Sequence, residues 1–351
     1  MLFVQHADSV EAMSQTAKIT PEESAPEESA AEESAAVKKP TPYDVVIVGG
    51  GAAGLAAAVA LGRSLRSVLV VDAGAQRNLP SEAAHNVLGR EGISPGDLLR
   101  VGRAEAESYG VEFVDGTATG AQCDESAGGF TVDVDGGTTV RARRVVLASG
   151  LVDVLPDIDG VRQAWGHGVL HCPYCHGYEV RGRRVGVIAS IAPQAVHQSL
   201  LFARLADRVT VFANGVDFDQ EQRADLDVMG VNVVHGVVSR VHVDGREARA
   251  IAVGDDRYDV DAVVVAPRML ARTELYERLG GRAEEHPMGR IIPADENGAT
   301  PVPGVWTAGN AGDLAAMVAS AAGAGVKLGA FVNADLVADD VRAARARAGG
   351  R

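Results

Sequence analysis

The sequence predicts an α/β protein built of two three-layer domains, the second inserted into the first. Three observations predict this arrangement. A glycine-rich turn near residue 50 joins an apolar strand to an Ala-rich helix, and a second strand–helix–strand unit begins at Arg183. A strand and a small-residue helix near the C-terminus then return to the first domain. We therefore expect the first domain at 43–155 and 289–340, the inserted domain at 156–288, and a tail at 1–42.

The first domain begins with a βαβ unit. Asp44–Val48 is a continuous apolar run, as in the buried strands of a parallel sheet. The helix predicted for Ala52–Leu65 leads to a second buried strand at Ser67–Asp72. Short alternating segments between Val111 and Val146 predict a β-meander that ends in the strand Arg144–Ala148.

The remaining elements repeat this logic. Apolar runs predict the strands, and longer runs with helical spacing predict the helices. The strands are expected at Arg183–Ser190, Arg208–Asn214, Asp261–Pro267 and Gly304–Ala308, and the helices at Gln194–Leu205 and about Leu314 to Ala338.

Composition excludes several classes of function. The net charge of −14 leaves no basic surface for nucleic acid, and aromatic residues make up only 4%. The apolar runs, such as Leu55–Leu61, are shorter than a membrane span. Met1 to Ala7 lacks a basic region followed by an apolar stretch, so we expect no signal peptide. The chain is expected to be cytoplasmic and to bind neither nucleic acid nor a membrane. Three cysteines do not make a disulfide framework.

The N-terminal 42 residues have the composition of a disordered acidic tail. EESA occurs three times at a five-residue spacing, and the tail holds eight acidic and three basic residues. So few large apolar side chains do not offset the entropy lost on ordering. The tail accounts for −5 of the net charge, which leaves −9 for the folded domains.

The turn Gly49-x-Gly51-x-x-Gly54 predicts a Rossmann-like dinucleotide site. Gly49 permits the tight turn, Gly51 lets the backbone approach a pyrophosphate, and Gly54 allows close helix–strand packing. The helix N-terminus offers free N–H groups to the phosphates. Asp72, eighteen residues beyond Gly54, is placed to accept from ribose hydroxyls. The pattern alone does not choose between FAD and NAD.

The most reactive feature of the chain is Cys172-Pro-Tyr-Cys175. Two thiols at this spacing form a redox couple. A second such pair would favour a zinc site, but the sequence has none, so we expect no metal. His171 and His176 flank the pair and are candidate acid/base groups that stabilise a thiolate. Cys123 is expected to be a buried small apolar residue without a role.

These motifs together resemble the low-molecular-weight thioredoxin reductases. The resemblance covers about Tyr43 to Asp335 and rests on VVIVGGGAAGLAAA, VLASG, CPYCHGYE and WTAGNAGD in that order. It implies that the first domain binds FAD, that the inserted domain carries the cysteines, and that the protein is a homodimer. The residues that it implies for FAD are Gly49, Gly51, Gly54, Asp72, Arg77, Asn78, Asn86, Gly309, Asn310, Ala316 and Met317.

The inserted domain departs from that family where NADPH would bind. Ser190 and Ala192 replace both turn glycines, and Ala213-Asn214-Gly215 offers no cation for a 2′-phosphate. His176 also stands where the reductases usually have Asp. With these departures, the sequence is similar to the flavin-dependent dithiol oxidases of gliotoxin and holomycin biosynthesis. The resemblance implies that FAD, O2 and the cysteine pair close a disulfide in a small dithiol and release H2O2.

Three other functions remain open. An NADPH-dependent thioredoxin reductase would require the altered turn to work. A ferredoxin-fed reductase would dispense with NADPH but need a protein-docking surface. A non-catalytic flavin-binding sensor would use the cysteines as a redox switch.

Overall fold

A mainly parallel sheet organises the first domain in the computed structural model, which describes residues 42–124 and 128–349. The predicted acidic tail lies outside the described residues, except for residue 42. The parallel strands run in the order β3 (Glu112–Asp115), β2 (Val68–Asp72), β1 (Tyr43–Val48), β6 (Thr138–Leu147) and β19 (Val305–Thr307). Because β19 pairs with β6, the end of the chain returns to the first domain as predicted.

An antiparallel meander extends this sheet from the first half of β6. It contains β4 (Ala118–Asp124) and β5 (Gly129–Val134), with the 3₁₀ turn η1 (Asp135–Gly137) between β5 and β6. We predicted that the whole stretch from Val111 would form the meander, but β3 pairs in parallel with β2. Alternating polarity marks a half-buried strand without fixing the direction of its partner.

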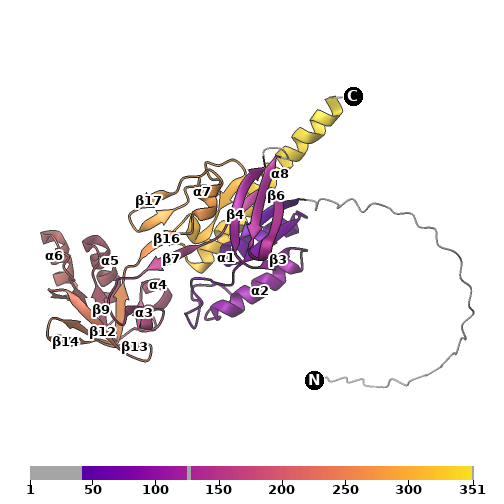
Figure 1. Cartoon of the computed structure of the whole chain (residues 1–351). Coiled ribbons are helices and arrows are strands. Elements are labelled where there is room, and N and C mark those ends of the chain that lie inside the picture. The colour runs from indigo at the N-terminus through magenta and orange to yellow at the C-terminus, as the bar shows by residue number, and fades with distance from the viewer. Residues whose placement is uncertain (1–41, 125–127, 350–351) are drawn as a thin grey trace, which may run out of the picture. The chain divides into compact units, whose positions relative to one another are not determined.

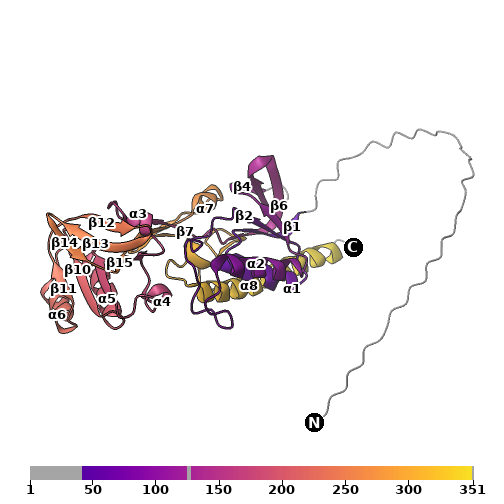
Figure 2. The ribbon, with the colours of Figure 1, turned by 90° about the horizontal axis from the view of Figure 1, so that it is seen from below.

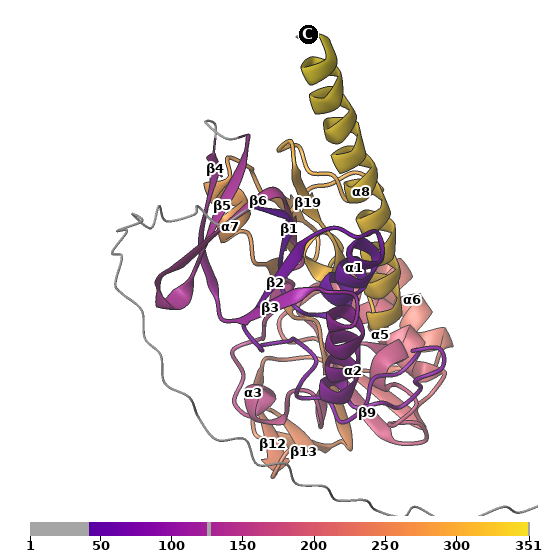
Figure 3. The same cartoon turned by 90° about the vertical axis from the view of Figure 1, so that its right-hand side faces the viewer.

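Three helices cover one face of the parallel strands: α1 (Ala52–Arg63), α2 (Pro95–Glu107) and α8 (Val318–Gly349) (Figures 1, 2 and 3). α1 and α8 pack with their backbones in contact, because a Cβ added to Gly325 would lie 2.1 Å from the carbonyl oxygen of Ala53. α8 begins four residues later than predicted and runs on to Gly349. The preceding stretch forms η2 (Gly309–Ala311) and a loop that lines the site described below.

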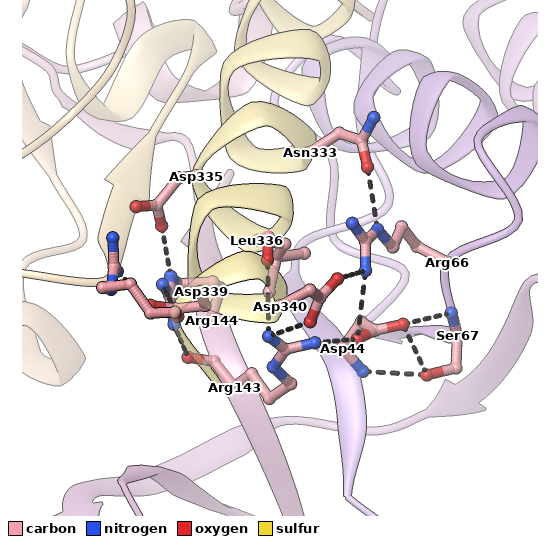
Figure 4. A network of polar contacts seen from close by, with 11 residues as sticks. Asp44, Arg66, Ser67, Arg143, Arg144, Asn333, Asp335, Leu336, Asp339 and Asp340 are labelled. Carbon is pink, nitrogen blue, oxygen red and sulfur yellow. Dashed lines mark hydrogen bonds and ion pairs between the residues drawn. The ribbon is translucent and has the colours of Figure 1, made fainter. Parts of the chain in front are cut away.

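Ion pairs join α8 to β1 and β6, two inner strands of the sheet (Figure 4). Arg143 donates to Asp44 at 2.9 Å and to Asp340 at 2.7 Å, while Arg144 pairs with Asp335 and Asp339. Among the described residues, α8 alone is long and apolar enough to cross a membrane. A core helix meets the same criteria, and α8 packs on α1.

The inserted domain repeats the design of the first. Its parallel sheet has the order β11 (Asn232–Val234), β10 (Arg208–Phe212), β9 (Arg184–Ile188), β15 (Ala262–Val265) and β8 (Val169–Leu170). A meander of β12 (Val238–Asp244), β13 (Glu247–Val253) and β14 (Asp256–Asp259) packs beside it. Its helices are α3 (Val161–Ala164), α4 (Pro173–His176), α5 (Ala192–Ala203) and α6 (Gln220–Val228).

Two antiparallel strands connect the domains: β7 (Leu151–Val154) and β16 (Arg268–Ala271). A small sheet continues from β16 through β18 (Gly289–Ile291) to β17 (Glu284–His286). After β16, α7 (Glu274–Arg278) buries Tyr276 in the apolar core of the first domain. The second crossover therefore lies at β16, and the predicted boundary at residue 288 is too late. A four-residue strand gave too short an apolar signal to locate it.

Candidate active site

The first glycine turn has the geometry that a bound pyrophosphate needs. Gly49 has φ +107°, and a Cβ there would lie 2.3 Å from the carbonyl oxygen of Ala148. A Cβ on Gly54 would lie 1.9 Å from the carbonyl oxygen of Gly49, so that residue lets α1 lie against the turn. Gly51 differs, because no protein atom lies within 4 Å of its added Cβ. That open space at the N-terminus of α1 is the cradle that a side chain would fill.

Asp72 closes the adjacent end of this cradle. Its carboxylate accepts from the backbone N–H of Gly50 at 3.1 Å and from the side-chain amide of Gln76 at 2.9 Å. These bonds orient the carboxylate at the end of β2 while it still lines the cavity. The remaining acceptor capacity of its two oxygens suits ribose hydroxyls.

A single cavity of about 1160 Å³ joins this cradle to the cysteine pair. It contains both predicted groups of residues, from the first domain and from the inserted one. Two predicted residues, Gly54 and Asn86, do not line it; Asn86 instead donates to the carbonyl oxygen of Tyr174 at 2.8 Å. The predicted residues that line the cavity are Gly49, Gly51, Asp72, Arg77, Asn78, His171, Cys172, Cys175, His176, Gly309, Asn310, Ala316 and Met317.

Asn310 organises the loop that leads into α8. Its side-chain amide donates to the carbonyl oxygens of Asp313 and Ala316, each at 3.0 Å. An aspartate would place a carboxylate against those carbonyls, so the asparagine found here fits this loop better than the family's usual Asp. Ala316 and Met317 follow directly and precede the free N–H groups at the start of α8.

The short helix α4 places the two cysteines. Cys172 is its N-cap, and its sulfur accepts from the backbone N–H of Cys175 at 3.2 Å. The Cys175 thiol donates to the same sulfur, which lowers the pKa of Cys172 to about 7 and raises the pKa of Cys175. Both residues are thiols in this structure. Cys172 is therefore the more nucleophilic sulfur at neutral pH, and Cys175 carries the proton.

His171 is held as a neutral imidazole beside Cys172. Its Nδ1 lies 3.1 Å from the carbonyl oxygen of Val265 and 3.2 Å from the side-chain amide nitrogen of Gln198. Because a carbonyl oxygen only accepts, this contact assigns the proton to Nδ1 and leaves Nε2 available to accept one. Burial lowers the pKa of His171. Gln198 on α5 donates to the carbonyl oxygen of His171 at 3.0 Å and is 4% exposed. This arrangement fixes the ring and leaves Nε2 of the neutral imidazole as a proton acceptor.

His176 contacts the first domain. Its Nε2 lies 3.0 Å from the hydroxyl oxygen of Ser81, which donates its own proton to the carbonyl oxygen of Ala83. Both bonds are satisfied when His176 carries its proton on Nε2 and keeps Nδ1 as an acceptor. Burial lowers the pKa of His176, so this imidazole is also neutral at neutral pH.

A charge pair lies beside the cysteines. Arg77 donates to both carboxylate oxygens of Asp153, on β7, at 2.7 Å each. The guanidinium makes a small further contribution to lowering the pKa of Cys172. Because the pair is neutral overall, this part of the cavity presents no unpaired charge to a substrate.

The second nucleotide turn is more altered than the sequence indicated. The N–H of Gly49 bonds the carbonyl oxygen of Val71, and the N–H of Ala189 makes the same bond to Phe212. The strands and helix caps align in the same way, so Ala189 and Ile191 stand in place of Gly49 and Gly51. Our assignment of Ser190 and Ala192 to these positions was wrong by one residue.

The same alignment places other residues of the second turn. Ala213 occupies the position of Asp72, and Gln194 the position of Gly54. Asn214 uses its side chain internally, donating to the carbonyl oxygen of Ala189 at 3.3 Å and accepting from the N–H of Val238 at 3.0 Å. The side chain of Ile191 blocks the close approach that a pyrophosphate requires.

Helix α5 faces the cysteine cavity instead. Gln194, His197, Gln198 and Leu201 line that cavity and recur at the spacing of one helix face. Helix α5, which stands where a pyrophosphate-binding helix would be, therefore forms one wall of the cavity that contains the cysteine pair.

One other expectation is wrong. Cys123 was predicted to be buried but is exposed on β4, where its sulfur lies 4.0 Å from the carbonyl oxygen of Leu279. The structure places Cys123 on an outer strand, where half of the side chains face solvent. Within residues 42–124 and 128–349, no cluster of His, Cys, Asp or Glu could hold a metal ion.

A dinucleotide cradle that opens onto a cysteine pair defines a disulfide oxidoreductase of the two-domain, dinucleotide-binding type. Residues 43–325 match the pyridine nucleotide-disulphide oxidoreductase family, and the chain belongs to it. Members of this family are typically flavoproteins.

Three similar proteins agree with this assignment. Thioredoxin reductase tcpT of Claviceps purpurea is 30% identical over 84% of this chain and 95% of its own length. The crystal structure of HlmI is 41% identical, with a TM-score of 0.82 over 88% of this chain and 96% of that one. An oxidoreductase from Agrobacterium tumefaciens is 35% identical, with a TM-score of 0.79 over 85% and 99%. The thioredoxin reductase-like fold is therefore established.

Three residues of the site were not identified from the sequence. Ser81, Asp153 and Gln198 are isolated polar residues in segments without a recognisable motif, and each acts on a partner at least 27 positions away. Only the position of Gln198 carried a signal. It lies one turn beyond Gln194 on α5, on the face that replaces a phosphate site.

Proposed function

We propose that this protein is an FAD-dependent oxidase that closes an intramolecular disulfide in a small dithiol and transfers the electrons to O2, giving H2O2. One observation carries the proposal. The first dinucleotide turn is open and shares its cavity with the cysteine pair, whereas Ile191 blocks the second turn. A reductase needs both turns, and an oxidase needs only the first.

The residues of the first domain fit FAD. The open cradle at Gly51, the oriented carboxylate of Asp72 and the length of the cavity suit an extended dinucleotide whose far end reaches the cysteines. The start of α8 would stabilise negative charge at that end. When bound, FAD supplies the electron acceptor for the reduced cysteine pair and the donor to oxygen.

The chain's own residues perform the thiol chemistry. A substrate thiolate attacks the sulfur of Cys172, breaks its bond to Cys175, and forms a mixed disulfide. Cys175 takes up a proton, consistent with its raised pKa. His171, neutral and with Nε2 free, removes the proton of the second substrate thiol. That thiolate closes the product disulfide and expels Cys172, whose pKa of about 7 makes it a good leaving group.

The cavity also suits a small, uncharged substrate. The wall formed by α5 offers two side-chain amides, an imidazole and Leu201, and the neighbouring Arg77 and Asp153 neutralise each other. Such a surface favours hydrogen bonds to amide groups over binding of an ion. The enzymes of gliotoxin and holomycin biosynthesis that the sequence resembles act on dithiols of this class.

The direct test is anaerobic mixing of the FAD-loaded protein with each electron donor. We expect dithiothreitol, or a holomycin-type dithiol, to bleach the flavin and NADPH to leave it oxidised. With oxygen present, dithiol consumption and H2O2 release should be equal. Rapid bleaching by NADPH but not by the dithiols would favour thioredoxin reductase and overturn the proposal. Cys172→Ser and Cys175→Ser should abolish turnover and keep FAD bound.

We also propose that the protein acts as a homodimer in the cytoplasm. Val326, Val337 and Val341 are 54%, 47% and 43% exposed on α8, and their spacing puts them on one face of the helix. Such an apolar stripe suits burial against a second copy. Sedimentation velocity checks the oligomeric state, and a monomer at micromolar concentration would contradict this proposal.

A further inference from the structure

A second, smaller cavity of about 260 Å³ lies beside the cysteine cavity. Ser81, His85 and His176 line both cavities. Glu179 and His167 line only the smaller one. Its lining includes the three histidines His85, His167 and His176 and the four carboxylates Glu82, Glu179, Glu247 and Asp261. None of these groups has a part in the thiol chemistry described above.

The polar contacts of this cavity fall into two groups, one at the residue after Cys175 and one that reaches solvent. His176, next to Cys175, holds Ser81 at 3.0 Å. His85 lies between two carboxylates, with Nε2 3.5 Å from Glu179 and Nδ1 2.7 Å from Glu91. The side chain of Glu91 is 65% exposed, so the last member of the series contacts bulk water.

The remaining gaps suit ordered water. A water molecule occupies about 30 Å³, so the cavity has room for several, each with polar partners on its walls. Glu179 raises the pKa of His176, whereas His85 and His167 lower it. The other charged groups that line the cavity are Glu82, Arg183, Glu247 and Asp261. The cluster is not arranged as a metal site, because no group of the described residues could hold a metal ion.

We propose that this smaller cavity is a proton-transfer chamber that carries thiol protons from the cysteine pair through His176 and Glu179 to solvent. The proposal rests on the dithiol exchange of the proposed function. Each substrate dithiol gives two electrons to the Cys172–Cys175 disulfide and releases two protons. Cys175 takes up one proton, and the other has to leave the site. Nδ1 of His176, the ring nitrogen that does not contact Ser81, accepts that proton, and the imidazolium returns to neutral by giving a proton through chamber water to the carboxylate of Glu179.

The test compares Glu179→Gln with wild type and with Glu221→Gln, a surface carboxylate on α6 of the same domain. The oxidised holoenzyme is mixed anaerobically with dithiothreitol, quenched with acid and alkylated, so that reduction of the cysteine disulfide is read directly. We expect Glu179→Gln to slow this reduction by about tenfold or more and to increase its solvent deuterium isotope effect. Glu221→Gln should match wild type, and Glu179→Asp should recover part of the rate.

The pH profile separates a relay from a packing role. His176 accepts protons only when neutral, so the exchange rate rises with pH through the pKa of His176. Loss of the Glu179 charge lowers that pKa, so in Glu179→Gln the rising limb moves to lower pH while its plateau falls. If the plateau of the exchange rate and the solvent isotope effect in Glu179→Gln equal those of wild type, the proposal of a proton-transfer chamber is overturned. Wild-type exchange without flavin bleaching would instead overturn the proposed function alone.

Discussion

The backbone N–H of Cys175 lies 3.2 Å from the sulfur of Cys172, and the Cys175 thiol donates to the same sulfur. These two hydrogen-bond donors to one sulfur give two chemically identical side chains different pKa values. The pKa of Cys172 falls to about 7, and the pKa of Cys175 rises. The residue that exchanges with substrate and the residue that retains a proton are thus distinguished by local hydrogen bonding.

This division predicts the pH dependence of alkylation. In the reduced Cys123→Ser protein, Cys172 should react with iodoacetamide at a rate that rises with pH through about 7. Cys175→Ala removes the thiol donor, so the pKa of Cys172 should rise and its rate at pH 7 should fall by up to about tenfold. Mass spectrometry after timed quenching checks both profiles. An unchanged profile in Cys175→Ala would mean that the backbone N–H alone stabilises the thiolate.

The neutral His171 predicts a large effect on dithiol exchange. His171→Gln keeps a hydrogen-bonding side chain but removes the basic Nε2, so reduction of the enzyme by dithiothreitol should slow by about 100-fold. Stopped-flow bleaching of the bound flavin measures the rate, and flavin absorbance checks that FAD stays bound. His235→Gln, an exposed histidine after β11, is the control and should match wild type. A loss of less than threefold in His171→Gln would assign the base elsewhere.

The sequence predicted the parts of the fold that depend on long apolar runs. Six elements lie within a few residues of their expected bounds, because buried parallel strands and their crossover helix have continuous apolar sequences. These are β1, α1, β2, β9, α5 and β10. β16, of four residues, carried no such signal, and the domain boundary was misplaced with it. α8 was expected too early because the apolar loop before it has the same composition as the helix.

The residues of the candidate site likewise fall into those that the sequence predicted and those that it did not. Motifs contiguous in sequence, such as Cys172-Pro-Tyr-Cys175, were found directly. Contacts between distant segments were not, because Ser81 and His176 or Arg77 and Asp153 meet only through the tertiary fold. The second nucleotide turn shows a further limit. Without a glycine to mark its start, the alignment had to come from the structure, through the backbone bond from Ala189 to Phe212 and the matching helix caps.

The network in Figure 4 predicts unequal costs for two arginines that share a partner. Arg144 and Arg342 both pair with Asp339, but their side chains are 11% and 65% exposed. Arg144→Met should lower the free energy of unfolding by about 1–3 kcal/mol, because it removes the partner of Asp335 and the more buried of the two partners of Asp339. Arg342→Met should cost less than about 1 kcal/mol, as an exposed pair does. Urea denaturation measures both, and equal losses would contradict the network's role in holding α8.

The two glycines of the first turn predict opposite effects of the same substitution. Gly51 has φ −78°, and no protein atom lies within 4 Å of an added Cβ. Gly51→Ala should therefore change the free energy of unfolding by less than about 1 kcal/mol, yet place a methyl group in the pyrophosphate cradle. We expect its affinity for FAD to fall by about tenfold or more, as measured by titrating flavin fluorescence on the apoprotein.

Gly54→Ala is the matched comparison, since its Cβ would lie 1.9 Å from the carbonyl oxygen of Gly49. That contact requires α1 to move away from the turn, at a cost of about 3 kcal/mol or more. Thermal denaturation of the two apoproteins should show a large loss of stability in Gly54→Ala and almost none in Gly51→Ala. If Gly51→Ala bound FAD as tightly as wild type, the pyrophosphate would not approach this turn, and the assignment of the first domain to FAD would fail.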